Sequence, residues 1–382
     1  MTNPPPHPLI YRRIVVKVGS NLLTAGTQRL DPLAMASIAA QVAELRAAGV
    51  QVVMVSSGAI AAGRHRLGDV EGGDGSGRDL PMRQALAAVG QSRLMAIWDG
   101  LFELEGIVVA QALLTRRDLA DRLGYLNARN TLLGLVERGV VPIVNENDVV
   151  SIEEIADSVI GDNDNLSAEV ANLVDAELLV ILTDIEGLYS ADPRHDPAAT
   201  LIREVARIDA AIIASAQGGA GERGIGGMAT KVQAAQVATQ AGVHVVVADG
   251  RVEGVLRLVA AGRAVGTHFL PTADRVESRR RYLRSRLQSR GRVTIDDGAA
   301  RALTYEGKSL LPAGVLGVEG EFQRGDVVRI VTTVGADLAS GSVNYSAAEI
   351  TQVMGQRSDR IAALLGYEYG EEIVHRNNLV LL

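Results

Sequence analysis

Short, continuous runs of Val, Ile and Leu recur along the first two thirds of this chain and constrain its fold more than any other feature. Stretches with helical character separate these runs. Continuous apolar runs are typical of strands that are covered on both faces, and helices between such strands favour a parallel sheet. We therefore predict an α/β fold, a three-layer αβα sandwich with a mainly parallel central sheet, with strands at residues 14–18, 50–55, 107–109, 140–144, 178–182 and 243–247.

The segment between the first two predicted strands carries helix signals at both ends. Asp31 is a favourable N-cap residue, and Pro32 suits the first helical position because its missing amide proton is not needed there. Gly49 suits the residue that follows a helix, where a left-handed backbone is common. The sequence therefore predicts a helix from Pro32 to Gly49.

The chain is longer than one typical hydrophobic core, so its 382 residues predict two domains. Its composition changes after Pro271, because eight arginines and only two acidic residues occur between Asp274 and Arg292. Further on, short apolar runs are broken by Gly and Asp, which indicates a small β-rich domain. We divide the chain into a flexible tail, a large α/β domain, an Arg-rich helical linker and a β-rich domain, at residues 1–13, 14–270, 271–290 and 291–382.

The composition excludes several classes of protein. There is no cysteine, which excludes disulfides, thiolate catalysis and cysteine-based zinc sites. The six histidines are scattered and form no H-E-x-x-H pattern, so we predict no metal site built from protein ligands. The net charge of −7 argues against a general nucleic-acid binder, and no signal peptide or membrane-spanning run is evident. We expect a cytoplasmic protein with no membrane partner.

Polar residues follow four of the predicted strands at the point where each strand ends. They lie at 17–20, 56–59, 145–148 and 183–184, and the segment GDNDNLS at 161–167 lies upstream of the last of these. Ligands of open parallel sheets bind outside the carboxyl ends of the strands, so we expect one shared ligand site there. Asp and Asn are also favoured helix N-caps, so capping is the alternative explanation of the 161–167 segment.

Two glycine-rich segments bear on phosphate binding. In the segment 224–231, glycines open a predicted helix and Lys231 lies in its first turns, a pattern that suits a phosphate because helix amides and the helix dipole favour anions. An exposed helical lysine is the alternative for Lys231. The segment 219–224 matches G-x-G-x-x-G, but it follows a helical run rather than a strand, which is the wrong context for a dinucleotide site.

The motifs together closely resemble those of the glutamate 5-kinases, which are members of the amino acid kinase family. The resemblance covers nearly the whole chain, and the tail resembles the PUA domain that many bacterial members carry. It implies the amino acid kinase fold and the ATP-dependent phosphorylation of the side-chain carboxylate of L-glutamate, the first step of proline biosynthesis. The matching segments are VVKVGSNLLT (15–24), VSSGAIAAGR (55–64), VPIVNENDVVS (141–151), GDNDNLSAE (161–169), LTDIEGLYSADPR (182–194) and GIGGMATK (224–231), with GRVTIDDGAARAL (291–303), SLLPAGV (309–315), GEFQRGD (320–326), GYEYG (366–370) and VHRNN (374–378) in the tail.

The resemblance also implies roles for individual residues. Lys17 and Lys231 match lysines that contact the transferred phosphate. Asp162 matches a carboxylate that organises these two lysines, and Asp164 lies beside it near the reacting groups. Position 225 departs from the family pattern, which usually has Thr where this chain has Ile. Positions expected to hold glutamate are Ser57, Asp148 and Asn163, and those expected to bind ATP are Lys17, Gly19, Thr183, Asp184, Ile225, Gly226, Gly227, Met228, Ala229, Thr230 and Lys231.

The chemistry expected of such a kinase needs no general base, because a glutamate side chain with a pKa of about 4.3 is already ionised at neutral pH. We expect Mg²⁺ to accompany ATP. The resemblance further implies inhibition by proline, a homodimer or homotetramer, and a glutamyl phosphate reductase as a partner.

Two alternatives to a glutamate kinase are open. One is a sister amino acid kinase with another carboxylate substrate, and the other is RNA binding by the PUA domain. The second is disfavoured, because residues 291–382 hold eight Lys and Arg against twelve Asp and Glu, a balance of −4.

Overall fold

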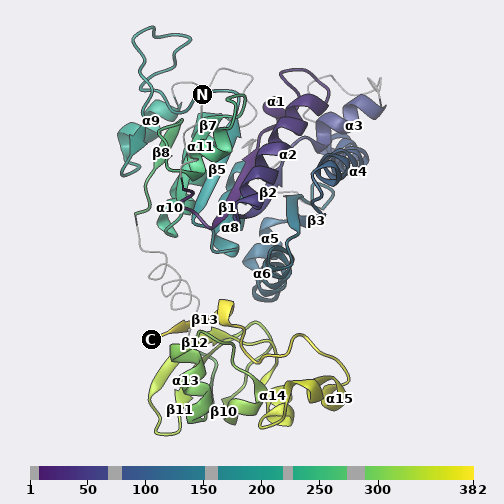
Figure 1. Ribbon diagram of the computed structural model, residues 1–382, viewed down its shortest axis with the longest axis vertical. Helices are drawn as coiled ribbons and strands as arrows, with labels where there is room; N and C mark the ends of the chain where they lie inside the picture. Colours follow the sequence, from purple (N-terminus) through teal and green to yellow (C-terminus); the bar gives the residue numbers. More distant parts are fainter. Residues whose placement is uncertain (1–7, 68–79, 151–161, 218–226, 273–288) are drawn as a thin grey trace, which may run out of the picture. The chain divides into compact units, whose positions relative to one another are not determined.

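The computed structural model describes residues 8–67, 80–150, 162–217, 227–272 and 289–382 (Figure 1). The chain forms two compact units, Met1–Leu119 with Ala128–Arg275 and Ala120–Asn127 with Val276–Leu382. Several predicted features lie outside the described residues, namely the first part of the tail (1–7), the glycine-rich loops at 71–79 and 218–226, and most of the Arg-rich linker (273–288).

The first unit is built on an eight-stranded sheet of order β3-β4-β2-β1-β5-β7-β8-β6. Neighbouring strands are parallel except β7 and β8, which pair antiparallel. The predicted α/β fold with a mainly parallel sheet is therefore confirmed. The strands are β1 (Arg13–Val18), β2 (Gln51–Ser56), β3 (Val109–Leu114), β4 (Val141–Glu146), β5 (Leu178–Thr183), β6 (Glu204–Val205), β7 (His244–Asp249) and β8 (Thr267–Phe269).

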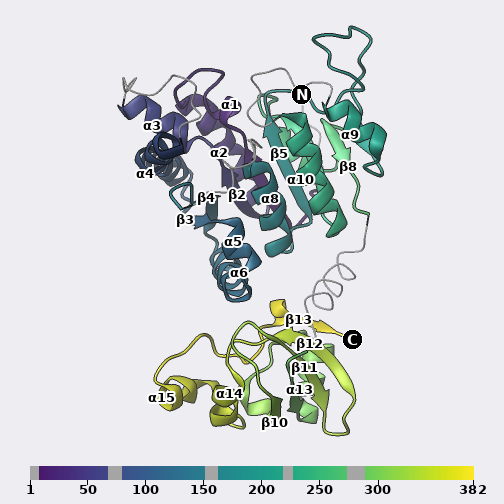
Figure 2. The same ribbon diagram turned by 180° about the vertical axis from the view of Figure 1, so that it is seen from behind.

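Helices cover both faces of this sheet (Figures 1 and 2). α2 and α11 pack together on one face, and α8 and α10 pack together on the other. The helices before β8 are α1 (Ser20–Leu23), α2 (Pro32–Ala47), α3 (Ala59–Leu67), α4 (Leu80–Leu104), α5 (Arg116–Ala120), α6 (Arg122–Glu137), α8 (Asp162–Leu173), α9 (Ala210–Gln217), α10 (Met228–Gln240) and α11 (Val255–Ala260). The end of α5 and the first part of α6 belong to the segment Ala120–Asn127 of the second unit, and the other helices belong to the first unit.

Alternation along β1 decides which side chain of the strand becomes functional. Ile14, Val16 and Val18 lie in the core that includes residues of α2 and α11. Successive strand residues point to opposite faces, so Lys17 lies on the face covered by α8 and α10. Its strand is flanked by β2 and β5, with Lys17 opposite Val55 and Ile181. A lysine in the middle of the sheet is thus brought under the first turns of two helices.

The sequence predicted the local signals of α2 correctly. The Asp31 carboxylate caps the helix by accepting from the amide of Leu33 at 2.8 Å, and Pro32 is its first residue. The helix ends at Ala47, and Gly49 has a φ of +84°, in the left-handed region that favours glycine. Both ends of the helix are therefore set by the residues that the sequence analysis identified.

The predicted strand at 107–109 was wrong in its position, because β3 runs from Val109 to Leu114. β3 is an edge strand with side chains that are half-buried or exposed, in contrast to the buried strands β4 and β5. Its sequence therefore lacks the continuous apolar run by which the other strands were recognised.

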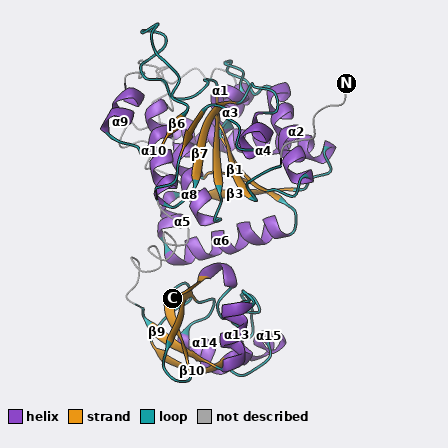
Figure 3. Cartoon of the chain, turned by 60° about the vertical axis from the view of Figure 1, so that its left-hand side comes forward, coloured by secondary structure: helices purple, strands orange, loops and turns teal. Residues whose placement is uncertain are grey.

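The second unit contains its own β-sheet, with β9 and β10 labelled in Figure 3. The sheet has five strands in the order β10-β9-β11-β12-β13, and only β9 and β11 pair parallel. A separate core of apolar residues, with Tyr345 and Phe322 among them, packs against this sheet. The expected small β-rich domain is therefore confirmed. Its elements are β9 (Gly291–Ile295), β10 (Val315–Gly320), β11 (Val327–Thr332), β12 (Asp337–Ser342), β13 (Leu379–Leu381), α13 (Asp297–Tyr305), α14 (Ala347–Val353), α15 (Ile361–Leu365) and the 3₁₀ turns Pro312–Gly314, Ser358–Arg360 and Arg376–Asn378.

Among the described residues, no helix is both long enough and apolar enough to cross a membrane.

Candidate active site

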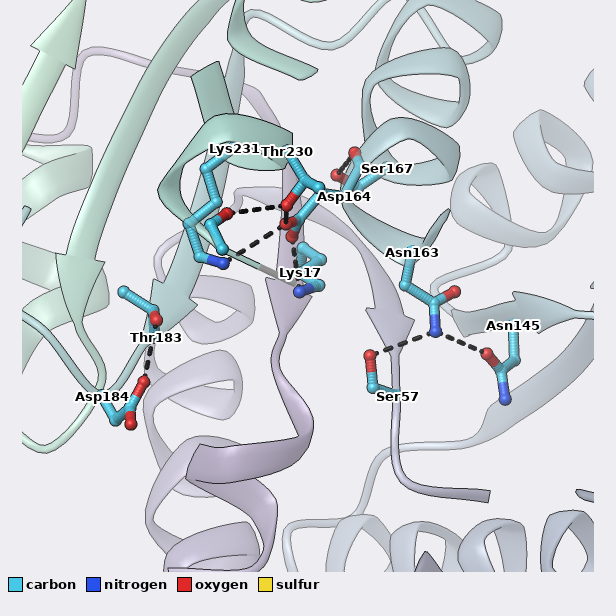
Figure 4. Close-up of polar contacts among 11 residues, drawn as sticks. Lys17, Ser57, Asn145, Asn163, Asp164, Ser167, Thr183, Asp184, Thr230 and Lys231 are labelled. Atoms are coloured by element: carbon cyan, nitrogen blue, oxygen red, sulfur yellow. Dashed lines mark hydrogen bonds and ion pairs between the residues drawn. The ribbon is translucent and has the colours of Figure 1, made fainter. Parts of the chain in front are cut away.

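The predicted polar residues lie at the carboxyl ends of the central strands. Lys17 is the last residue but one of β1, Thr183 is the last residue of β5, and Ser57 directly follows β2. Helices α8 and α10 begin at the same edge of the sheet, and their first turns contribute further polar side chains (Figure 4). The polar groups form two clusters, one charged and one made of amides and a hydroxyl.

The charged cluster is centred on Asp164 of α8, which lies between two lysines. Its Oδ1 is 2.5 Å from Nζ of Lys17, and its Oδ2 is 3.3 Å from Nζ of Lys231 (Figure 4). The Thr230 hydroxyl lies 2.7 Å from Oδ2 and 2.8 Å from the carbonyl oxygen of Gly227, at the start of α10. We call Lys17, Asp164, Thr230 and Lys231 the lysine cluster.

Burial strengthens the electrostatic interactions among the charges of the lysine cluster. The exposed fractions are 6% for Lys17, 5% for Lys231 and 1% for Asp164. Burial lowers the pKa of Lys17, and the nearby charge of Lys231 lowers it further, against the opposing effect of Asp164. Burial also raises the pKa of Asp164, but the two lysines outweigh it and hold that pKa below its usual range. With all three groups ionised the cluster carries a net charge of +1.

The position of this cluster adds to its affinity for anions. Thr230 and Lys231 lie in the first turn of α10, where unpaired amides and the helix dipole favour negative charge. Gly19 follows β1, and a Cβ added there would lie 3.6 Å from Nζ of Lys17. A backbone without a side chain therefore borders the lysine, which leaves room beside it. The arrangement suits a phosphate.

The carboxylate between the lysines is Asp164, whereas the resemblance had given this position to Asp162. Asp162 is the first residue of α8, and its side chain lies outside the description that the structure gives. The lysine-organising role that the resemblance implies for Asp162 therefore stays a prediction.

The second cluster is built from amides and a hydroxyl. Nδ2 of Asn163 donates to Oγ of Ser57 and to Oδ1 of Asn145, each at 3.1 Å (Figure 4). Nδ2 of Asn145 in turn donates to Oε1 of Gln91 at 2.8 Å, and the Asn145 oxygen also accepts from the backbone amide of Glu146 at 2.9 Å. We call Ser57, Gln91, Asn145 and Asn163 the amide cluster.

A third group of contacts lies at the ends of β5 and β7. The Thr183 hydroxyl lies 3.2 Å from Oδ1 of Asp184, and Asn21 donates to Oδ2 of Asp184 at 3.2 Å. Arg251 donates to the Asp184 carbonyl oxygen at 2.7 Å and pairs with Asp249. These contacts fix the loop that follows β5.

Comparison with known proteins places this site in a family. Residues 12–249 match the model of the amino acid kinase family, and residues 291–365 match the PUA domain. The chain belongs to the amino acid kinase family. A glutamate 5-kinase of Herpetosiphon aurantiacus is 52% identical over 371 residues, which cover 97% of this chain and 98% of that protein. A glutamate 5-kinase of Geobacter sulfurreducens is 51% identical over 371 residues, with the same coverage.

Among solved structures, a UMP kinase from Bacillus anthracis matches with a TM-score of 0.47 and 16% sequence identity. The match covers 69% of the present chain and 97% of the UMP kinase chain.

The other predicted site residues of this amino acid kinase are placed less completely. Asp148 is half-buried in the turn after β4, and none of the contacts given above includes it. Met228 and Ala229 lie in the first turn of α10. Ile225 and Gly226 lie outside the described residues, so the effect of Ile at position 225 is untested.

The described parts of this kinase contain no group of three or more His, Asp or Glu side chains that could hold a metal ion. Asp164 is engaged by two lysines and a hydroxyl, which is unlike the free carboxylate that a divalent cation binds. Within the lysine cluster, Asp164 therefore does not present a free carboxylate to a divalent cation.

Sequence reasoning missed two members of the amide cluster. Asn145 was part of a recognised polar segment at the end of β4, but no role was assigned to it. Gln91 lies within the long helix α4 and carries no local signal, because an isolated glutamine in a helix is ordinary. Only the contact with Asn145 identifies Gln91.

Proposed function

We propose that this protein transfers the terminal phosphoryl group of ATP to the side-chain carboxylate of L-glutamate, which yields L-glutamyl 5-phosphate and ADP in proline biosynthesis. The lysine cluster, at the carboxyl end of β1 and the first turns of α8 and α10, is the observation that carries the proposal. The choice of glutamate is supported by relatives of this name that are about half identical over nearly their full length.

In this reaction a carboxylate oxygen of glutamate attacks the γ-phosphorus and a new P–O bond forms. The bond from the γ-phosphorus to the bridging oxygen breaks, and ADP leaves with that electron pair. The carboxylate is already ionised, so no proton has to be removed. The chemical demand on the protein is to bring two anions together and to stabilise the redistributed charge.

The lysine cluster can meet this demand. Two unit negative charges at 4 Å repel by about 4 kcal/mol at an effective dielectric constant near 20. Lys17 and Lys231 offset this repulsion, and the carboxylate of Asp164 holds both ammonium groups at fixed positions. We assign Lys17 and Lys231 to the transferred phosphate and Asp164 to the positioning of the lysines.

We assign the two flanking groups to the two substrates. Ser57, Asp148 and Asn163 are proposed to hold glutamate. The loop after β5, with Thr183 and Asp184, and the start of α10 are proposed to hold ATP. Mg²⁺ is proposed to enter with the ATP phosphates, which matches its preference for phosphate and water ligands.

The deciding experiment is a substrate panel. Purified protein with ATP should form ADP rapidly with L-glutamate and slowly or not at all with L-aspartate, N-acetyl-L-glutamate and carbamate. Faster turnover with any of the other three compounds would show that the substrate is that compound and not glutamate. Absence of turnover with all four substrates would contradict the proposed function.

The regulation that the resemblance implies is a separate proposal. We propose that proline competes with glutamate, so added proline should lower the rate at subsaturating glutamate and much less at saturation. We also propose that a glutamyl phosphate reductase consumes the labile product and that the kinase is a homodimer or homotetramer. Light scattering of the purified chain checks the last point, and a monomer would contradict it.

A further inference from the structure

The orientation of the amide cluster follows from one backbone N–H group. A backbone amide can only donate, so the atom of Asn145 that lies 2.9 Å from the amide of Glu146 must be its oxygen, Oδ1. The other end of the Asn145 side chain is then the NH₂ group, and it faces Gln91 at 2.8 Å. Gln91 must therefore present its carbonyl oxygen to Asn145.

The same logic orients Asn163. Because Oδ1 of Asn145 is an acceptor, Asn163 turns its NH₂ group toward it and also toward Ser57 (Figure 4). The carbonyl oxygen of Asn163 is left on the opposite side of the amide. This oxygen is buried and has no hydrogen-bond partner among the described residues. A buried acceptor without a partner is costly, which favours a ligand that donates a hydrogen bond there.

Helix α4, which carries Gln91, packs unusually close to helix α3. A Cβ added at Gly90 would lie 1.8 Å from the carbonyl oxygen of Ala59, and one added at Gly63 would lie 1.9 Å from that of Leu86. The α3–α4 contact thus needs glycine at both positions. Gln91 follows Gly90 directly, so the close approach of the two helices sets where its side chain begins.

A second glutamine of α4 contacts the same region of the chain. Gln84 donates to the carbonyl oxygen of Val149, in the turn that follows β4. Gln84 and Gln91 are seven positions apart and therefore lie on one face of the helix. Helix α4 is thus fixed both to the end of β4 and to the turn that contains Asp148.

We propose that Gln91 is a positioning residue that fixes the orientation of the Asn145 and Asn163 amides, so that the carbonyl oxygen of Asn163 accepts a hydrogen bond from the ammonium group of the amino-acid substrate. This inference rests on the proposed function, because it takes the substrate to be an amino acid. Gln91 itself does not touch the substrate. Its loss frees the NH₂ end of Asn145 and allows both amides to turn.

The test compares three variants. Gln91→Met keeps the length of the side chain but removes the strong acceptor. Gln91→Glu keeps an acceptor at the same position. Ser92→Ala, at the next and exposed position of α4, is the matched control. Gln91→Met should raise the KM for glutamate about tenfold or more with little change in kcat or in the KM for ATP, as expected for a buried hydrogen bond used in binding. In Gln91→Glu the KM for glutamate should return most of the way to the wild-type value, and Ser92→Ala should resemble wild type.

A ligand without the ammonium group separates positioning from a general structural defect. Glutarate has the two carboxylates of glutamate but no ammonium group, and its inhibition constant can be measured against glutamate. Gln91→Met should weaken the binding of glutamate at least tenfold and the binding of glutarate by less than about twofold, since only glutamate has the ammonium group that makes the contact. Equal losses for both ligands, or an unchanged KM for glutamate, would overturn the proposal.

Binding can also be followed without turnover. Trp98 is the sole tryptophan of the chain, and its ring N–H donates to Oγ of Ser56, the neighbour of Ser57. Its fluorescence should therefore report glutamate binding in the wild type and a weaker affinity in Gln91→Met. A wild-type protein that neither binds nor phosphorylates glutamate would overturn the proposed function, whereas an active wild type with an unaffected Gln91→Met would overturn only the role of Gln91.

Discussion

The lysine cluster and the amide cluster meet on helix α8 but differ in what holds them. Asp164 belongs to the first and Asn163 to the second, and adjacent residues of an α-helix point about 100° apart. One cluster contains three buried charges, whereas the other contains hydrogen bonds between neutral groups. A single helical turn can therefore contribute to a buried charged cluster on one side and to an oriented amide network on the other.

The two clusters also respond differently to the loss of one member. Removal of the Asp164 charge from the lysine cluster leaves two buried ammonium groups without a counter-charge, which is expensive. Removal of an amide leaves one unsatisfied donor or acceptor, which costs less. Variants of the first cluster should therefore affect the chemical step and stability, and variants of the second should affect the binding of one substrate.

The largest effect is expected when a lysine is removed. Lys17→Ala or Lys231→Ala should lower kcat by about a thousandfold, because each removes a preorganised charge from the transferred phosphate. The KM for glutamate should change little. Steady-state kinetics measure both quantities, and Lys308→Ala, at an exposed lysine of the second unit, is the control. Near-wild-type turnover in either variant would show that the lysine replaced in it takes no part in the reaction.

Loss of the central carboxylate should affect stability as well as rate. Asp164→Asn leaves two buried ammonium groups without a counter-charge, and we expect the free energy of unfolding to fall by about 3–5 kcal/mol. Denaturant titration of the variant and the wild type measures this difference. The neutral substitution Asn163→Leu should cost less stability, and the reverse order would contradict the contrast between the two clusters.

A smaller and more selective effect is expected in the amide cluster. Asn163→Leu should raise the KM for glutamate by about 10- to 100-fold, the range for a lost buried hydrogen bond and the unpaired group it leaves. The KM for ATP should remain within a few-fold of its wild-type value, as judged from initial rates at saturating glutamate. An equal rise in both constants would mean that the substitution disturbs the whole edge of the sheet.

The smallest effect is a shift in the pH profile. Burial lowers the pKa of Lys17, so its ammonium group loses its proton at a lower pH than an ordinary lysine, whose pKa is about 10.4. We expect kcat to fall on the alkaline side with an apparent pKa below that value. Arginine keeps its charge at high pH, so Lys17→Arg should retain its residual rate there. If kcat falls at high pH in the same way in the wild type and in Lys17→Arg, the fall is due to a group other than Lys17.

The pH dependence of stability has the opposite direction. The pKa of Asp164 is lower in the folded protein than its usual value of about 3.9, so the stabilisation by its ion pairs is fully present above that pH. It is lost as the pH falls through the folded-state value. Acid unfolding of Asp164→Asn should lack this contribution, which a comparison of unfolding free energies between pH 5 and pH 3 can detect.

The sequence by itself determined the parallel sheet, the ends of α2 and the edge of the sheet at which the site lies. Continuous apolar runs and helix caps are local signals, and the carboxyl ends of parallel strands have to meet at one edge. It also determined most of the polar residues there, because they lie at the ends of strands or in the first turns of helices, namely Lys17, Asn163, Thr183 and Lys231. The family resemblance added their expected roles.

Only the tertiary structure decided which carboxylate lies between the lysines and which glutamine holds the amides. Asn163 and Asp164 are adjacent in the sequence, but their side chains belong to different clusters. Gln91 follows Gly90, one of the two glycines at the close contact of α3 and α4, and it contacts Asn145 across a separation of 54 residues in the chain. The direction of a side chain and the distance between helices depend on packing across the whole unit, and no local pattern in the sequence encodes either of them.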